Sequence, residues 1–392
     1  MKLLILSFYY HPDLSAGSFR TSALVKALLE QLPADAQIEL ITTLPNRYSS
    51  FTNDAPEYEV HPRLIVHRIA LPAHQSGMID QSKAFLSYAR GVLKLVKGQQ
   101  YDLVYATSSR LMTAWLGAFA ARRLRAPLYL DIRDIFVDTI KDVLPRKIAV
   151  FLTPVFSVLE SWTIRRADRV NLVSAGFLPY FQRRYPTQRF SFFTNGIDDE
   201  FIQEQPQVDT VSGQGVLNVV YAGNMGEGQG LHAIIPALAK RFEGRLRFRL
   251  IGDGGRRKQL ADSLAAAGCR NVELLAPVGR DTLICEYKTA DVLFLHLNDH
   301  DAFRKVLPSK LFEYAALGKP IWAGVAGYAA DFVGTNISNA VTFSPCCADE
   351  AVLSFEKLQL CTKARADFVE NFSRVNIMKD MASDVVASAG RT

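Results

Sequence analysis

The stretch NVVYAGNMGEGQGLHAIIPALA, residues 218–239, contains a complete strand, turn and helix. Its first residues, Asn218–Tyr221, form a short apolar run next to glycine, which is typical of a buried parallel strand. A helical pattern follows from Leu231 to Ala239. The turn between them, Gly223–Gly230, is of the glycine-rich kind that offers backbone N–H groups to an anion at a helix N-terminus. The stretch therefore predicts a βα unit with an anion-binding turn, and a plain turn without a ligand is the alternative.

The same alternation of short apolar runs and helical patterns extends in both directions from this stretch. Strands are predicted at residues 3–7, 38–42, 64–68, 103–106, 128–131, 170–173, 190–194, 218–221, 248–251, 272–274, 292–295, 321–323 and 340–343. Helices are predicted at residues 19–32, 83–97, 113–124, 231–239, 256–266, 281–289 and 310–316. Strands that alternate with helices indicate βαβ units and parallel sheets, so we predict an α/β protein.

The length of the chain predicts two domains. It has 392 residues, about twice the size of a typical domain. The segment 203–215 is polar and contains Pro and Gly, which is typical of a linker. We predict one doubly wound domain over residues 1–200, a second over 201–366, and a helical tail over 367–392 that is able to cross back to the first. Doubly wound sheets bind ligands at the carboxyl ends of their strands, so the ligand cleft is expected there.

The stretch LPSKLFEY, Leu307–Tyr314, is the most informative for a ligand site. Pro308 and Ser309 predict the start of a helix, with Ser309 as its N-cap. Lys310 then falls in the first turn, where its cation and the free helix N–H groups suit a diphosphate. Glu313 lies one turn later and is able to accept two hydrogen bonds from ribose hydroxyls. The alternative is a capping box, in which Glu313 reaches back to Ser309.

Several stretches resemble the family-4 retaining glycosyltransferases, in order and spacing, from about residue 1 to residue 335. They are PSKLFEY with AxGKPI (308–321), ADRVNLVS (167–174), NGID (195–198), YAGN (221–224), GDG (252–254) and ADV (290–292). The similarity is closest to bacterial members that build surface polysaccharides. It implies the GT-B architecture, in which two Rossmann-like, doubly wound parallel-sheet domains face a central cleft. It also implies an enzyme of hexosyltransferase type.

The resemblance assigns a role to each domain. The second domain is expected to bind a nucleoside-diphosphate sugar, and the first to bind the acceptor. Donor-binding residues are expected at Gly17, Gly223, Asn224, Gly252, Asp253, Gly254, Val278, Leu307, Pro308, Ser309, Lys310, Leu311 and Glu313. Catalytic residues are expected among Asp131, Arg133, Asp134 and Lys310. No cofactor and no metal ion are expected.

Two departures from the family pattern affect this assignment. Many members carry an E-x7-E motif whose second Glu matches Glu313, but Lys305 stands where the first Glu is expected. Many members also place an Arg and a Lys in the turn that corresponds to Gly223–Gly230, and this turn contains neither. The charge of the donor phosphates must then be met elsewhere. Lys310, Arg304 and Lys305 are the candidates.

Two further polar stretches follow predicted strands. Asp131, Arg133 and Asp134 end a strand of the first domain, where the resemblance implies an acceptor-side or catalytic group; a structural ion pair is the alternative. Asp299 and Asp301 form a D-x-D pair, which holds a divalent metal in other glycosyltransferase folds. We expect no metal at this pair, because the surrounding motifs belong to the architecture that does not use one.

The charge distribution points to an anionic partner of the first domain. Residues 83–189 contain 18 Lys and Arg against 7 Asp and Glu, whereas the whole chain has a net charge of +6. Within this region the apolar run Ile148–Leu159 follows Arg146 and Lys147. The run is too short to span a bilayer, but it suits the surface of an anionic membrane. The alternatives are a solvated basic face and a buried core helix.

These observations lead to expectations about partners and location. We expect a polyprenyl-diphosphate-linked glycan as acceptor, an anionic membrane surface as partner, and no nucleic acid. Met1–Ser7 is expected to be a buried strand rather than a signal peptide, so the protein is placed in the cytoplasm, at the inner face of the cell membrane. Five cysteines without C-x-x-C spacing agree with a reducing compartment. Two rival functions remain, a sugar-nucleotide epimerase with the same fold and an inactive homologue that binds the nucleotide sugar.

Overall fold

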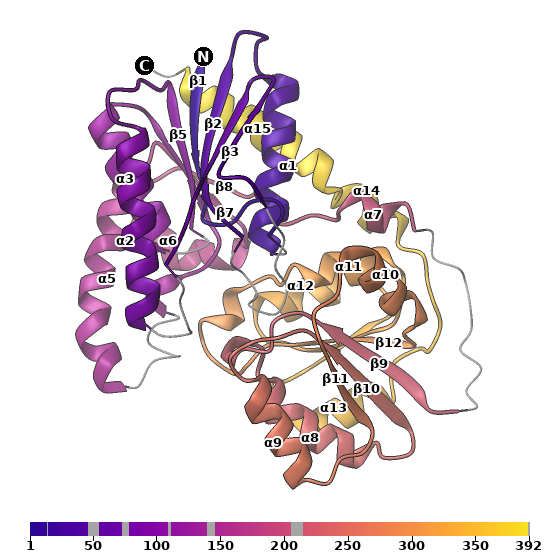
Figure 1. Ribbon diagram of the computed structural model, residues 1–392. Coiled ribbons are helices and arrows are strands. Elements are labelled where there is room, and N and C mark those ends of the chain that lie inside the picture. The colour runs from indigo at the N-terminus through magenta and orange to yellow at the C-terminus, as the bar shows by residue number, and fades with distance from the viewer. Residues whose placement is uncertain are drawn as a thin grey trace. The chain divides into compact units, whose positions relative to one another are not determined.

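The chain forms two compact units, Met1–Asn195 with Val375–Thr392, and Gly196–Arg374 (Figure 1). The computed structural model describes residues 1–13, 15–45, 55–72, 78–108, 111–138, 146–204 and 215–390. Each unit contains a sheet of mainly parallel strands with helices packed on it. Both sheets confirm the predicted α/β class.

The first unit is built on an eight-stranded sheet with the order β3-β4-β2-β1-β5-β6-β7-β8. All neighbouring strands are parallel except β3 and β4. The strands are β1 (Lys2–Leu6), β2 (Gln37–Thr43), β3 (Tyr58–His61), β4 (Leu64–Ile69), β5 (Leu103–Thr107), β6 (Leu128–Ile132), β7 (Arg169–Leu172) and β8 (Phe190–Ser191). Strands β5 and β6 are buried at every residue, which explains their continuous apolar sequence.

Helices cover both faces of this sheet. They are α1 (Ala16–Gln31), α2 (Met78–Leu95), α3 (Leu111–Leu124), α5 (Arg146–Arg166), α6 (Leu178–Arg184) and α15 (Arg374–Ala389), with a 3-10 turn η1 (Ala175–Phe177). Figure 1 shows α2, α3 and α5 on one face and α1 with α15 on the other. On that second face, Leu24 and Leu28 of α1 share a buried cluster with Met378 and Met381 of α15.

The second unit contains a six-stranded parallel sheet with the order β11-β10-β9-β12-β13-β14. The strands are β9 (Leu217–Ala222), β10 (Leu246–Ile251), β11 (Val272–Leu275), β12 (Val292–His296), β13 (Ile321–Gly324) and β14 (Ala340–Phe343). The helices are α7 (Asp199–Ile202), η2 (Glu227–Gln229), α8 (Leu231–Arg241), α9 (Arg257–Ala266), α10 (Arg280–Thr289), η3 (Phe303–Lys305), α11 (Lys310–Ala316), α12 (Tyr328–Asn336), α13 (Ala348–Phe355) and α14 (Ala366–Asn371).

The central strand β9 shows why this sheet is buried on both faces. Val219 and Tyr221 belong to the apolar cluster beneath α8 and α13, whereas Val220 and Ala222 belong to the cluster beneath α10 and α11. Successive side chains of a strand point to opposite faces, so each layer of helices receives alternate residues.

The structure differs from the sequence-based expectations in several places; among the helices that were not predicted are α6, α7, α12 and α13. Strand β3 was not predicted, because it is an exposed antiparallel edge strand without an apolar run. The first unit ends at Asn195, whereas the predicted boundary is residue 200, because Ile197 and Phe201 are fully buried in the second unit. The predicted tail contains two helices, of which α14 ends at Asn371 and α15 begins at Arg374. Of the predicted linker, residues 205–214 lie outside the described residues.

Candidate active site

Two glycine turns lie side by side at the carboxyl ends of β9 and β10. Gly223 follows β9 and Gly252 follows β10, with φ angles of +143° and +142° that favour glycine. A methyl group on Gly252 would overlap the carbonyl oxygen of Gly223, and one on Gly254 would lie 2.6 Å from Asn224 Oδ1. The two backbones therefore approach each other as closely as glycine permits. The Asp253 carboxylate accepts a hydrogen bond from the backbone N–H of Gly254 at 2.8 Å, which fixes the second turn.

Lys310, the first residue of α11, lies against the turn after β9. A methyl group on Gly223 would overlap the end of the Lys310 side chain. The ammonium lies 5.4 Å from the centre of the Tyr221 ring, and the Tyr221 hydroxyl donates to the carbonyl of Asn224 at 2.6 Å. The predicted neighbours Gly223, Asn224 and Lys310 are thus brought together in one part of the second unit.

The start of α11 differs from the prediction at Ser309. This residue stands at the N-cap position, but its backbone is helical, with φ −60° and ψ −29°, and its side chain makes no capping hydrogen bond. Leu307 and Leu311 place their side chains in the apolar core, and Val278 packs against the same cluster. A ligand at this position would therefore meet the backbone of these three residues rather than their side chains.

Glu313 faces Arg280, the first residue of α10, instead of capping its own helix. Arg280 Nη1 lies 3.7 Å from Glu313 Oε1, and the two side chains are 17% and 13% exposed. Burial raises the pKa of Glu313, an effect that nearby Asp198 reinforces, whereas Arg280, Lys310 and Arg374 lower it. The net result is a carboxyl group whose pKa lies above its ordinary value. The capping-box alternative is therefore wrong.

Arg304, one of the three cations proposed to replace those missing from the glycine turn, is paired with acidic side chains. Arg304 Nη2 lies 3.0 Å from Asp299 Oδ1, and Arg304 Nε lies 3.8 Å from Asp301 Oδ1. Both carboxylates of the D-x-D pair are therefore paired with an arginine. Within the turn itself, Glu227 pairs with Arg256 at 2.6 Å. Of the three candidates, Lys310 is the one that the structure brings to Gly223.

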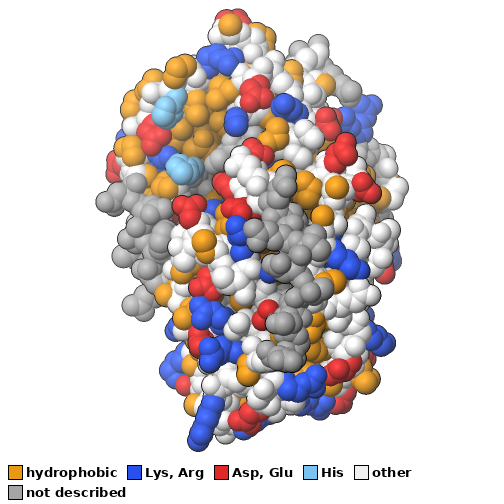
Figure 2. Space-filling model, turned by 90° about the vertical axis from the view of Figure 1, so that its right-hand side faces the viewer, with side chains coloured by type: hydrophobic (Ala, Val, Ile, Leu, Met, Phe, Trp, Pro, Cys, Tyr) orange, Lys and Arg blue, Asp and Glu red, His pale blue; other side chains and the backbone are white. Residues whose placement is uncertain are grey.

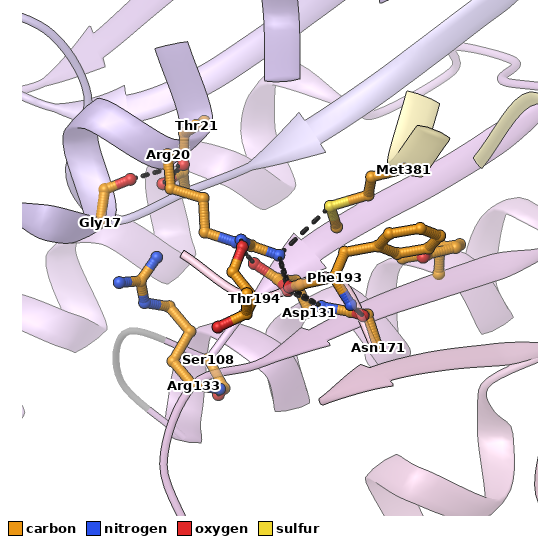
Figure 3. Close-up of polar contacts among 12 residues, drawn as sticks. Gly17, Arg20, Thr21, Ser108, Asp131, Arg133, Asn171, Phe193, Thr194 and Met381 are labelled. Carbon is orange, nitrogen blue, oxygen red and sulfur yellow. Dashed lines mark hydrogen bonds and ion pairs between the residues drawn. The ribbon is translucent and has the colours of Figure 1, made fainter. Parts of the chain in front are cut away.

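Asp131 of the first unit is fully buried, and protein groups occupy both of its oxygens (Figure 3). Arg20 donates from Nε to Oδ2 at 2.8 Å and from Nη2 to Oδ1 at 3.0 Å, and Asn171 donates to Oδ1 at 2.7 Å. Burial alone would raise the pKa of Asp131, but the charge of Arg20 outweighs it and the pKa lies below its ordinary value. The structural ion pair, the alternative for this stretch, describes Asp131.

Arg133 and Asp134 are placed differently from Asp131. The Arg133 backbone N–H donates to Ser108 Oγ at 2.8 Å, and Figure 3 shows its side chain apart from the Arg20–Asp131 pair. Among the described residues, no acceptor lies within hydrogen-bonding distance of Arg133 Nη1, although this atom is buried. The Asp134 side chain is exposed. Arg133 is therefore the member of this stretch with a donor to offer a ligand.

Gly17 lies inside the first turn of α1 rather than in a loop before it. Ser15 caps this helix by accepting the N–H of Ser18 at 3.1 Å, and the carbonyl of Gly17 accepts from the Thr21 hydroxyl at 2.9 Å. Neither Arg20 nor Arg280 was predicted from the sequence. Arg20 could have been predicted, because it lies three residues after Gly17 and therefore on the same face of the helix. Nothing in the sequence pointed to Arg280.

Comparisons with known proteins agree with this arrangement. Residues 21–196 match the family of glycosyl transferase 4-like domains, and residues 207–374 match the glycosyl transferases group 1. The protein WcaI of Escherichia coli (strain K12), named as a glycosyl transferase of colanic acid biosynthesis, is 33% identical over 100 residues. That match spans 26% of this chain and 24% of WcaI.

Solved structures of similar fold cover nearly the whole chain. Sucrose-phosphate synthase from Thermosynechococcus elongatus has a TM-score of 0.73 at 14% identity and covers 98% of each chain. Anabaena HepE, solved with UDP and glucose, has a TM-score of 0.67 at 17% identity, covering 99% of this chain and 100% of HepE. WaaG, a glycosyltransferase involved in lipopolysaccharide biosynthesis, has a TM-score of 0.64 at 14% identity, covering 99% and 97%. These similarities show that the fold is GT-B.

Proposed function

The chain belongs to the family-4 glycosyltransferases, and from this premise we propose that it transfers a sugar, with retention at the anomeric carbon, from a nucleoside-diphosphate sugar to a glycan. The acceptor that we propose is carried on polyprenyl diphosphate and is extended during synthesis of a bacterial surface polysaccharide. The contact of Lys310 with the turn at Gly223, beside the partly buried carboxylate of Glu313, is the observation that carries the proposal.

In this proposal the donor nucleotide binds the second unit. The ammonium of Lys310 and the backbone of the turns at Gly223 and Gly252 meet the diphosphate, because all three lie together at the carboxyl end of the sheet. The carboxylate of Glu313 accepts hydrogen bonds from the ribose hydroxyls. Asn224 and Asp253 hold the two turns in shape through their own hydrogen bonds.

The chemistry that we propose needs no metal ion. When the glycosidic bond to the diphosphate breaks, negative charge develops on the leaving oxygen, and a fixed cation stabilises it. Lys310 supplies this cation in the second unit. In the first unit, Arg133 is the residue that we propose contacts an anionic reacting group, since its Nη1 has no acceptor among the described residues. Asp131 positions Arg20 and does not touch substrate.

The acceptor proposal draws support from α5. Four apolar side chains, Ile148, Phe151, Val155 and Val158, recur at helical spacing and are between 41% and 80% exposed. The buried core helix, the alternative for this run, is therefore wrong. Arg165 and Arg166 follow in the last turn. The side chains of Arg146 and Lys147 lie outside the described residues.

We propose that this face of α5 rests on an anionic membrane from the cytoplasmic side, with its apolar residues in the headgroup region. Among the described helices, none is long and apolar enough to cross a membrane. On the face drawn in Figure 2, basic and acidic side chains are interspersed and form no single basic patch.

A transfer assay tests the proposed function. The full chain is incubated with a panel of nucleotide sugars and a polyprenyl-diphosphate-linked sugar, in EDTA and in Mg²⁺, and the anomeric configuration of the product is read by NMR. We expect one donor to be consumed at equal rates in both buffers, giving product with the anomeric configuration of the donor. Turnover lost in EDTA and restored by Mg²⁺ would revive Asp299 and Asp301 as metal ligands. Epimerised donor without transfer would favour the epimerase, and no turnover of any donor the inactive homologue.

A further inference from the structure

Arg280 lies at the centre of a charged cluster in the second unit. Its guanidinium donates to Asp198, lies 3.7 Å from Glu313 Oε1, and lies 3.9 Å from Glu200 Oε2. It also stacks on the ring of Phe201 at 4.7 Å. The side chain is therefore fixed by three acidic groups and an aromatic face, although its residue is the first of α10.

Asp198, the partner on the far side of Arg280, is itself held in place. Arg374 Nε lies 2.6 Å from Asp198 Oδ1, and Arg374 Nη2 donates to the carbonyl of Gly196 at 2.9 Å. Arg374 is only 3% exposed. Arg280 thus has a rigid anchor in Asp198 and a longer, looser contact with Glu313.

The longer contact matters for what Glu313 is able to do. At 3.7 Å the Arg280–Glu313 pair is electrostatic, and no hydrogen bond to the Glu313 carboxylate is found within the described residues. A carboxylate has about four lone-pair directions for hydrogen bonds. The lone pairs of the Glu313 carboxylate remain available to a ligand, and the neighbouring Arg280 cation restricts the orientation of the carboxylate.

We propose that Arg280 is a positioning residue for ribose recognition: by spanning Asp198 and Glu313 it orients the Glu313 carboxylate toward the two ribose hydroxyls of the nucleotide. The inference rests on the proposed function, because it needs a nucleotide whose ribose meets Glu313. It adds a residue that does not touch the ligand and that acts through its charge and its forked shape.

The charges around Glu313 predict a signature that a merely structural role would not give. Burial and Asp198 raise the pKa of Glu313, and Arg280, Lys310 and Arg374 lower it, with Arg280 first among the three. Tyr287 and Tyr314 pack beside them as neutral groups, since burial raises the pKa of each well above its ordinary value. Removing the Arg280 charge therefore raises the pKa of Glu313 further, and its protonated form is a weaker acceptor of the ribose hydrogen bonds than the carboxylate.

Calorimetry with UDP and with 2′,3′-dideoxy-UDP tests the proposal, because only the first ligand has the ribose hydroxyls. The ratio of the two affinities reports ribose recognition and cancels titration of the phosphates. We expect R280Q to lower this ratio about tenfold, the effect of losing a charge-assisted hydrogen bond. We also expect the ratio in R280Q to begin to fall at a higher pH than in the unmodified protein as the pH is lowered, because loss of the Arg280 charge raises the pKa of Glu313.

Two further variants make the outcome decisive. R280K keeps the charge but not the fork that spans two carboxylates, so we expect an intermediate ratio with the same pH dependence as the unmodified protein. D198N removes the anchor and an acidic neighbour, and we expect its ratio to fall without a new pH dependence. Circular dichroism checks the fold of each variant, and R280K provides the test if R280Q does not fold.

The results separate the two levels of the proposal. If the unmodified chain binds neither UDP nor any other nucleoside diphosphate, the donor assignment and the role of Arg280 both fall; if it binds another one, that nucleotide and its dideoxy form replace UDP in the comparison. If it prefers UDP over the dideoxy ligand, and folded R280Q or R280K keeps that preference in full, only the role of Arg280 is contradicted.

Discussion

Each unit has an arginine–carboxylate pair near the carboxyl ends of its strands, and the two pairs differ in distance, exposure and the pKa of the carboxylate. In the first unit, Arg20 and Asp131 are joined at 2.8 Å, and each side chain is 1% exposed. In the second unit, Arg280 and Glu313 are separated by 3.7 Å and are partly exposed. The pKa of Asp131 lies below its ordinary value, whereas that of Glu313 lies above it.

The difference teaches which carboxylate is available to a ligand. Asp131 has donors on both oxygens, so its interactions are already complete in the folded protein. Glu313 is desolvated by burial and incompletely compensated, which is typical of a group that gains its partners from a substrate. We call Arg20–Asp131 the closed pair, because its hydrogen bonds are complete within the protein, and Arg280–Glu313 the open pair, because its carboxylate can still accept them. The closed pair therefore stabilises the fold, and in our proposal the open pair binds the ligand.

The largest effect that we expect is a loss of stability on opening the closed pair. Asp131→Ala leaves the buried guanidinium of Arg20 without its counter-ion, which should lower the free energy of unfolding by about 3–5 kcal/mol. Urea denaturation of the full chain measures this change. Asp134→Ala is the matched control, because that side chain is exposed, and it should change stability by less than about 0.5 kcal/mol. Equal effects of the two substitutions would show that the comparison of the pairs is wrong.

The same pair predicts a direction for the pH dependence of stability. The folded pKa of Asp131 lies below its unfolded value, so its contribution is present above the unfolded pKa and is lost as the pH falls through the folded pKa. Denaturation of the unmodified protein and of Asp131→Asn between neutral and acidic pH should therefore converge at low pH. A constant difference between the two across that range would contradict the assignment.

A smaller effect is expected at the exposed face of α5. Replacing Phe151 and Val158 together by Ser removes two apolar side chains from the proposed membrane contact, which should weaken binding to anionic vesicles about tenfold. Leu353→Ser is the matched control, since Leu353 is equally exposed, at 65%, on α13 of the second unit. Co-sedimentation at two salt concentrations measures the effect, and binding should weaken with salt. Absence of binding to anionic vesicles at low salt would favour a soluble acceptor.

The smallest effect sharpens the comparison at the open pair. Because the folded pKa of Glu313 is raised, its ionised form is unfavourable in the folded protein above the unfolded pKa. Glu313→Gln should therefore leave the thermal stability at neutral pH unchanged or raise it, by about 0.5–1 kcal/mol, while it weakens nucleotide binding. A marked loss of stability would mean that Glu313 is a structural residue like Asp131.

The local sequence predicted the strands because parallel, doubly covered strands have continuous apolar runs. Strand β9 is an example, and the prediction at residues 218–221 lies within its observed bounds. The contact residue Lys310 at the turn of Gly223 was also predicted, because it lies in a motif that is contained in one short stretch, Leu307–Tyr314. Strand β3 was missed, because at an exposed edge Tyr58 and Val60 alternate with polar residues.

The pairs themselves could not be predicted from the sequence. Arg20 and Asp131 are 111 residues apart, and they meet only because β1 and β6 lie on either side of β5 in the folded sheet. Arg280 and Glu313 are brought together by the packing of α10 and α11 on the same face. Contacts between residues so far apart in sequence cannot be predicted from charge and spacing along the chain. Asp131 was therefore expected to be catalytic, whereas in the structure it forms a buried ion pair with Arg20.

The central claim is that Lys310 and Glu313 form the donor site, and calorimetry with nucleoside diphosphates tests it most directly. Lys310→Ala and Glu313→Ala should each weaken binding by about 2–3 kcal/mol, because each removes a charge-assisted interaction, whereas Asp301→Ala should leave it unchanged. Unchanged affinity for every nucleoside diphosphate in both Lys310→Ala and Glu313→Ala would contradict the account.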